Sequence, residues 1–104
     1  MASYVVLLTF TDEGRRTWLD PSGIDAAKQA VQAMGAQWKG WYMTMGRYDI
    51  VLILEAPDDD TMARLALTQG TTGLIKSETL RAFTEEEVRQ LVALLPPPPT
   101  ATTQ

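Results

Sequence analysis

The stretch from Met45 to Asp59 constrains the fold more than any other part of the chain. It holds a Gly46-Arg47 pair typical of a tight hairpin turn, then an apolar run, then a proline and an acidic helix start. Because strand side chains alternate between faces, Asp49 and Glu55 point to the same side of this run. The stretch therefore predicts a hairpin strand that carries two carboxylates on one face and leads directly into a helix.

Hydrophobic periodicity predicts the other strands and helices of the 104-residue chain. Strands are expected at residues 4–10, 37–45, 48–55 and 74–83, and helices at 11–34, 58–69 and 84–95, the first of them broken at Asp20-Pro21-Ser22-Gly23. The order β-α-β-β-α-β predicts an α+β, ferredoxin-like sandwich with an antiparallel sheet of order 4-1-3-2 and an extra C-terminal helix. Residues 1–95 form the expected domain, and the Pro/Thr-rich residues 96–104 form a tail.

The Gly46-Arg47 turn also predicts a register for the hairpin. It places Tyr42 opposite Val51 and Trp38 opposite Glu55. The register assigns the following residues to one face: Trp38, Tyr42, Thr44, Asp49 and Glu55. Trp41 falls on the other face, so the aromatic residues of this segment cannot all line one pocket. They could line a hydrophobic ligand site or serve as core and subunit-interface anchors.

One face of the predicted sheet lacks a covering layer, because both crossover helices pack on the same side. The uncovered face offers these side chains: Val5, Leu7, Tyr42, Val51 and Ile53. Exposing them to water is unfavourable by roughly 25 cal/mol per Å². We therefore expect the chain to pair with itself, most simply as a two-fold homodimer that packs sheet on sheet.

Composition excludes several classes of function. The net charge is −4, with no basic stripe, so nucleic acid is not expected as a partner. No apolar run approaches the ~18 residues of a membrane span, and no signal-peptide pattern is present, so we expect a cytoplasmic protein that does not bind membranes. Because the chain has no Cys and no His, thiolate nucleophiles, zinc sites with such ligands and His-based triads are excluded. No metal or cofactor is expected.

Several motifs resemble those of the GYD domain family. They are Gly46-x-Tyr48-Asp49, Glu55-Ala56-Pro57-Asp58-Asp59, Glu78-Thr79, Arg81-Ala82-Phe83-Thr84, Tyr4-Val5-Val6-Leu7 and Phe10-Thr11-Asp12-x-Gly14. The resemblance covers roughly residues 3–87 and implies a ferredoxin-like fold of the dimeric α/β-barrel type. Related barrel proteins include small monooxygenases, lactone isomerases, polyketide cyclases and haem-degrading enzymes, although a shared fold is weak support for function. The resemblance supplies no catalytic residue, and the lack of His argues against haem.

Asp49 is the residue at which chemistry is most expected. In a buried setting its carboxylate could serve as a general base, whereas beside a turn it would hydrogen-bond the hairpin backbone or Thr44. Glu55 could bind a ligand, pair with Arg81 or remain solvated. The candidate catalytic residues are Asp49, Tyr42 and Arg81. The candidate ligand-binding residues are Trp38, Tyr42, Tyr48, Asp49 and Glu55.

Two functions are compatible with these features. The first is a small oligomeric domain that binds a small apolar molecule or serves as a structural or assembly module. The second is a cofactor-independent isomerase, cyclase or monooxygenase of the dimeric α/β-barrel type. A closed apolar cavity with one buried carboxylate would favour the enzyme, and an interior packed solid with side chains would favour the module.

Overall fold

The computed structural model describes residues 1–18 and 20–98. Its elements are β1 (Ala2–Phe10), α1 (Asp12–Trp18), α2 (Pro21–Ala33), β2 (Gln37–Met43), β3 (Ile50–Ala56), α3 (Asp59–Gly70), β4 (Ile75–Ala82) and α4 (Glu85–Ala93). The predicted break in the first helical region is confirmed. Asp20 caps α2 by accepting a hydrogen bond from the Ser22 backbone N–H, and Pro21 occupies the first turn.

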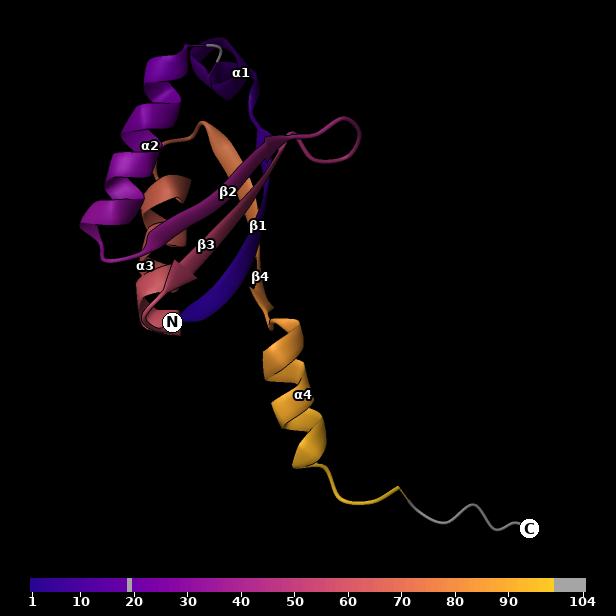
Figure 1. Cartoon of the computed structure of the whole chain (residues 1–104). Helices are drawn as coiled ribbons and strands as arrows, with labels where there is room; N and C mark the ends of the chain where they lie inside the picture. The colour runs from indigo at the N-terminus through magenta and orange to yellow at the C-terminus, as the bar shows by residue number, and fades with distance from the viewer. Residues whose placement is uncertain (19, 99–104) are drawn as a thin grey trace.

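The four strands form one antiparallel sheet of order β2-β3-β1-β4. Read from the other edge this is 4-1-3-2, so the predicted ferredoxin-like arrangement is confirmed. Helices α1, α2 and α3 lie to one side of the sheet (Figure 1). The alternate residues of β1 and β3 that point to this side form the core: Tyr4, Val6, Leu8, Ile50, Leu52, Leu54 and Ala56.

The start of α1 is held against the segment that precedes β4. The Thr11 backbone N–H donates to the Leu74 carbonyl oxygen at 3.0 Å, and its side-chain hydroxyl contacts the same loop. Gly14 lies so close to this backbone that a Cβ atom there would be 1.8 Å from the Leu74 oxygen. Glycine is therefore required at position 14 by a close backbone approach.

The hairpin between β2 and β3 differs from the sequence-based prediction in two respects. The strands end at Met43 and Ile50, so a longer loop, closed by a hydrogen bond from the Thr44 N–H to the Asp49 carbonyl oxygen, replaces the two-residue turn (Figure 1). Gly46 does adopt the positive φ expected of it, at +113°. The predicted two-residue turn is therefore wrong: residues 44–49 connect the strands, and the Thr44 hydroxyl also donates to the Tyr48 carbonyl oxygen within this loop.

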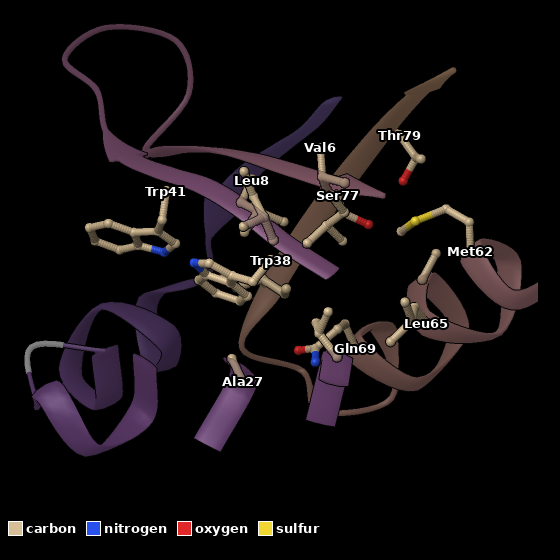
Figure 2. A pocket seen from close by; sticks show the side chains of 15 residues that line it. Val6, Leu8, Ala27, Trp38, Trp41, Met62, Leu65, Gln69, Ser77 and Thr79 are labelled. Carbon is tan, nitrogen blue, oxygen red and sulfur yellow. The ribbon is translucent and has the colours of Figure 1, made fainter. Parts of the chain in front are cut away.

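The second difference is a β-bulge between Trp38 and Gly40. The predicted pairing of Tyr42 with Val51 is correct, but Trp38 pairs with Leu54 instead of Glu55. One extra residue in a strand reverses the direction of every side chain beyond it. Trp38 and Trp41 therefore point to the same side of the sheet, toward the helices, and the predicted division between them is wrong (Figure 2).

Helix α4 extends from the end of β4, away from the other elements (Figure 1). A capping box begins this helix: the Thr84 hydroxyl accepts from the Glu87 N–H, and the Glu87 carboxylate accepts from the Thr84 N–H. None of its residues is buried. Helix α4 therefore does not dock on its own sheet.

Candidate functional site

The face of the sheet opposite the helices has no covering element among the described residues. Two rows of side chains cross all four strands on this open face. One row consists of Leu80, Val5, Ile53 and Gly40, and the other of Glu78, Leu7, Val51 and Tyr42. The aliphatic residues predicted for this face are therefore together, and all are at least partly exposed. Tyr42 is 59% exposed, and its ring lies over Gly40, where a Cβ would be 3.2 Å from the ring edge.

A polar pair borders the open face at one end. The Tyr48 hydroxyl donates to the Glu78 carboxylate at 2.6 Å, which connects the β2–β3 loop with β4. This hydrogen bond to Glu78 raises the pKa of the Tyr48 hydroxyl. The guanidinium of Arg47 lies 5.7 Å from the centre of the Tyr48 ring. Tyr48 thus contributes a fixed polar contact, with the hydroxyl held as a donor.

The carboxylate of Asp49 is occupied by the backbone. Its Oδ2 accepts from the Phe10 N–H at 2.8 Å, and the Asp49 N–H donates to the Leu8 carbonyl oxygen at 2.8 Å. The side-chain partner is therefore on β1, not the hairpin backbone or Thr44. The Thr44 hydroxyl instead donates to the Tyr48 carbonyl oxygen at 2.6 Å. This arrangement favours the structural interpretation of Asp49 over that of a general base.

Arg81 lies at the opposite end of the sheet from Asp49. It pairs with Tyr4, six residues along β1 from Phe10, which corresponds to about 20 Å. Its guanidinium lies 4.4 Å from the Phe83 ring centre and 5.6 Å from that of Tyr4, and it donates to the Ser3 carbonyl oxygen at 3.2 Å. The candidate catalytic residues Asp49 and Arg81 therefore do not converge on one point.

Near Arg81, Tyr4 connects the sheet with helix α3. Its hydroxyl donates to the Asp59 carboxylate in the first turn of that helix. Burial of Tyr4, together with this hydrogen bond, raises the pKa of the phenol to about 12. The sequence analysis did not single out this pair, because 55 residues separate its members along the chain.

The five candidate ligand-binding residues separate into different places. Trp38 faces the helices, whereas Tyr42 and Glu55 lie on the open face, with Glu55 next to Ser3 of β1 and Gln37 of β2. The part of the chain that the structure describes contains no ion pair between Glu55 and Arg81. Nor does it contain a group of three His, Cys, Asp or Glu residues arranged to hold a metal ion. A compact site with these five residues is thus not formed within one copy of the chain.

A cavity lies on the other side of the sheet, between the strands and the helices α2 and α3 (Figure 2). Its volume is about 40 Å³, and most of its lining is apolar. Trp38 and Trp41 line it from β2, Leu65 from α3, and Ser77 and Thr79 from β4. The expectation of Trp38 in an apolar pocket is compatible with this geometry. Trp41 lies on the face predicted for it, with Ile50 and Leu52, whereas the bulge moves Trp38 to this face from the predicted face of Tyr42.

Helix α4 presents a second exposed apolar surface. Its stripe consists of Val88, Leu91, Val92 and Leu95. The exposed fraction of each residue lies between 44% and 65%. Three glutamates occupy the first turn, and Arg89 pairs with Glu85 at 2.6 Å. No helix in the described part of the chain is long and apolar enough to cross a membrane. The stripe thus gives α4 an amphipathic pattern whose apolar side is exposed.

Comparison with known proteins identifies the family of the chain. The family model for the GYD domain matches residues 4–92. A protein from Thermus thermophilus, named "Glutamine synthetase and cystathionine beta-lyase binding protein", is 34% identical over 97 residues. The match covers 91% of the present chain and 99% of the Thermus protein. The two chains are therefore similar over nearly their whole lengths.

Proposed function

The chain belongs to the GYD domain family, and we propose that it is a small binding module that docks on other protein chains, including copies of itself. The observation that carries this proposal is helix α4, which is fully capped yet has no buried residue. An isolated helix of fewer than about 12 residues is marginal in water, even with good capping. A nine-residue helix with an apolar stripe therefore gains most of its stability when that stripe is covered.

The partner of α4 is proposed to be a different protein with an apolar groove bordered by basic residues. Glu85, Glu86 and Glu87 form an acidic first turn beside the stripe, and only Arg89 offsets them. A basic border would complement this charge, speed association and reject acidic partners. The name of the Thermus relative describes that protein as binding two enzymes, which supports an enzyme subunit as the partner class here.

The open sheet face is proposed to pair with a second copy of the chain. Val5, Leu7, Val51 and Ile53 form a continuous apolar area across the central strands. Covering this area would stabilise the dimer by roughly 25 cal/mol for each Å² of apolar surface removed from water. A two-fold axis would place the same rows of both copies against each other. The cytoplasmic location expected from the sequence remains a prediction.

The alternative function, a cofactor-independent isomerase, cyclase or monooxygenase, has less support. Asp49 is held by the β1 backbone, and Arg81 lies about 20 Å away along the sheet. Tyr42 lies on the open face, on the edge strand β2. General acid–base chemistry needs groups within hydrogen-bond reach of one reacting atom, and these three candidates are not so arranged within one copy.

Docking through α4 is tested with purified glutamine synthetase and cystathionine β-lyase from the same organism as this chain. We expect calorimetry to detect binding of at least one enzyme, and Leu91→Asp to abolish it. The matched control is Gln90→Asp, which adds the same charge at a neighbouring exposed position outside the stripe. If neither enzyme binds at micromolar concentration, or if both variants lose binding equally, the α4 proposal is wrong.

Self-association is tested separately by sedimentation velocity. We expect a dimer or larger assembly at micromolar concentration and a monomer for Val51→Lys, which places a charge in the centre of the open face. The control Gln32→Lys introduces the same charge on an exposed position of α2. A monomeric natural chain would refute the pairing of sheets without affecting the α4 experiment.

A further inference from the structure

The cavity between sheet and helices offers a binding site that is independent of both docking surfaces. Its lining includes side chains from all four strands and from α2 and α3 (Figure 2). Since neighbouring strands are about 4.8 Å apart, the four strands that supply these side chains together span about 14 Å. It lies on the side away from the open face, so sheet pairing would leave it accessible.

The chemistry of the lining defines the class of molecule that fits. No Asp, Glu, Lys or Arg side chain is among the lining residues, so a charged ligand would lose its hydration without compensation. Apart from the indole N–H groups of Trp38 and Trp41, the polar members are Gln69, Ser77 and Thr79. Ser77 and Thr79 are exposed on the edge strand β4, which places the polar end of the cavity at the surface. The site thus suits a neutral molecule with an apolar body.

A buried, unpaired donor lies on the β2 side of the cavity. The indole N–H of Trp41, on the edge strand β2, is buried and has no hydrogen-bond partner among the described residues. A buried unpaired donor is unfavourable, and an acceptor brought to it recovers a full hydrogen bond. In this conformation the nitrogen is covered, so an acceptor reaches it after a small rotation of the neighbouring side chains.

Water is a poor match for this end of the site. An ordered buried water needs two to four polar partners, whereas the walls near Trp41 are formed by residues such as Leu8 and Leu52. An apolar molecule with one acceptor would gain dispersion contacts with the same walls. A volume of about 40 Å³ corresponds to about three or four water-sized groups at 10–15 Å³ each.

We propose that this cavity binds a small neutral carbonyl compound, or the short carbonyl-bearing end of a longer one, with its oxygen accepting a hydrogen bond from the Trp41 indole N–H. The apolar part lies against Leu65 and the neighbouring aliphatic side chains, and any further polar group lies at Ser77 and Thr79. The bulge at β2 is what makes the site, because it turns Trp38 and Trp41 to the same side.

The test compares two probes of similar shape, 2-butanone and 2-methyl-1-butene, which differ in having C=O or C=CH₂. In NMR titrations at millimolar concentration, we expect 2-butanone to shift the Trp41 indole proton downfield in a saturable manner. We expect 2-methyl-1-butene to perturb the methyl signals of the lining without that downfield shift. Trp41→Phe keeps an aromatic ring but removes the donor. It should weaken the binding of 2-butanone by about 3- to 10-fold and leave the affinity for 2-methyl-1-butene unchanged.

A second pair of variants separates cavity binding from surface binding. Ala66→Leu, on the cavity side of α3, should prevent binding of both probes, whereas Ala63→Leu, at an exposed position of the same helix, should not. Retained dispersion in the amide spectrum establishes that each variant is folded. Absence of a saturable shift in the natural chain, equal effects of Trp41→Phe on both probes, or binding unchanged by Ala66→Leu would each overturn the proposal.

Discussion

The Asp49 carboxylate accepts a hydrogen bond from the backbone N–H of Phe10 at 2.8 Å, although 39 residues separate the two along the chain. The Asp49 N–H in turn donates to Leu8 two residues earlier on β1. Together these bonds continue the contact between β1 and the β3 side of the hairpin beyond the last paired residues, Leu8 and Ile50. The carboxylate is thus a substitute for a missing backbone acceptor at the end of the sheet.

We predict that Asp49→Ala lowers the free energy of unfolding by about 1–3 kcal/mol, because the Phe10 N–H loses a charged acceptor. Asp49→Asn should lower the free energy of unfolding by less, since its amide oxygen can still accept the hydrogen bond from the Phe10 N–H. Urea denaturation of both variants measures the difference. If Asp49→Ala is as stable as the natural chain, the hydrogen bond has no structural role.

Gly14 supplies a prediction about packing. Gly14→Ala should destabilise the chain by about 1–3 kcal/mol, because its Cβ would be 1.8 Å from the Leu74 carbonyl oxygen and the backbone must move. Gly70→Ala is the matched control, since no atom lies within 4 Å of the added carbon and the site ends a helix. We expect that change to be neutral or stabilising by up to about 1 kcal/mol. Equal melting temperatures for the two variants would contradict the close approach.

The pair of Tyr4 and Asp59 supplies a third prediction. Tyr4→Phe removes the donor and should reduce stability by about 0.5–1.5 kcal/mol, a typical net value for one hydrogen bond. A double-mutant cycle with Asp59→Ala should yield a positive coupling energy. In a spectrophotometric titration, the tyrosine that ionises near pH 12 should be absent from Tyr4→Phe. Full additivity in the cycle would show that the contact contributes nothing.

The stability of the fold should also decrease as the pH falls below about 4. Donation from the Thr61 hydroxyl and backbone N–H lowers the pKa of Asp58, which caps α3. A carboxyl whose pKa is lower when folded contributes stability above its unfolded pKa, about 3.9, and loses it as the pH falls through the folded pKa.

Thermal melts between neutral pH and about pH 3 should therefore show a falling melting temperature below about pH 4. Asp58→Asn, which can still cap the helix, should show a smaller fall. Because the pKa values of Asp20 and Glu87 are lowered by the same kind of capping bond, some pH dependence should remain in that variant. An identical pH profile for the natural chain and Asp58→Asn would exclude this role for the cap.

Much of the fold could be predicted because its signals are local. The capping box of Thr84 and Glu87 and the cap at Asp20 involve residues within three positions of each other. Alternation along β3 predicted its buried face correctly. The sheet order followed from one hairpin and two helical crossovers, since these connections leave few topologies for four strands.

The candidate site was predicted less well, since its geometry depends on contacts between distant segments. Asp49 bonds Phe10 of the neighbouring strand β1, whereas the bond from Tyr48 to Glu78 passes β1 and reaches β4. No pattern within these segments shows where the strands end relative to one another. The bulge near Lys39 moved Trp38 to the helix side. Gly40 is the local signal that could have indicated it, because a glycine inside a strand often marks a bulge.

By itself, the sequence determined which segments become strands and helices, and which face of the central strands is apolar, because hydrophobic period and capping are properties of neighbouring residues. Only the tertiary structure decided that both Trp38 and Trp41 line one cavity, that the Asp49 carboxylate is bound by β1, and that α4 leaves the sheet with its stripe exposed. These outcomes depend on register and on which surfaces meet, and both are set by packing across the whole chain.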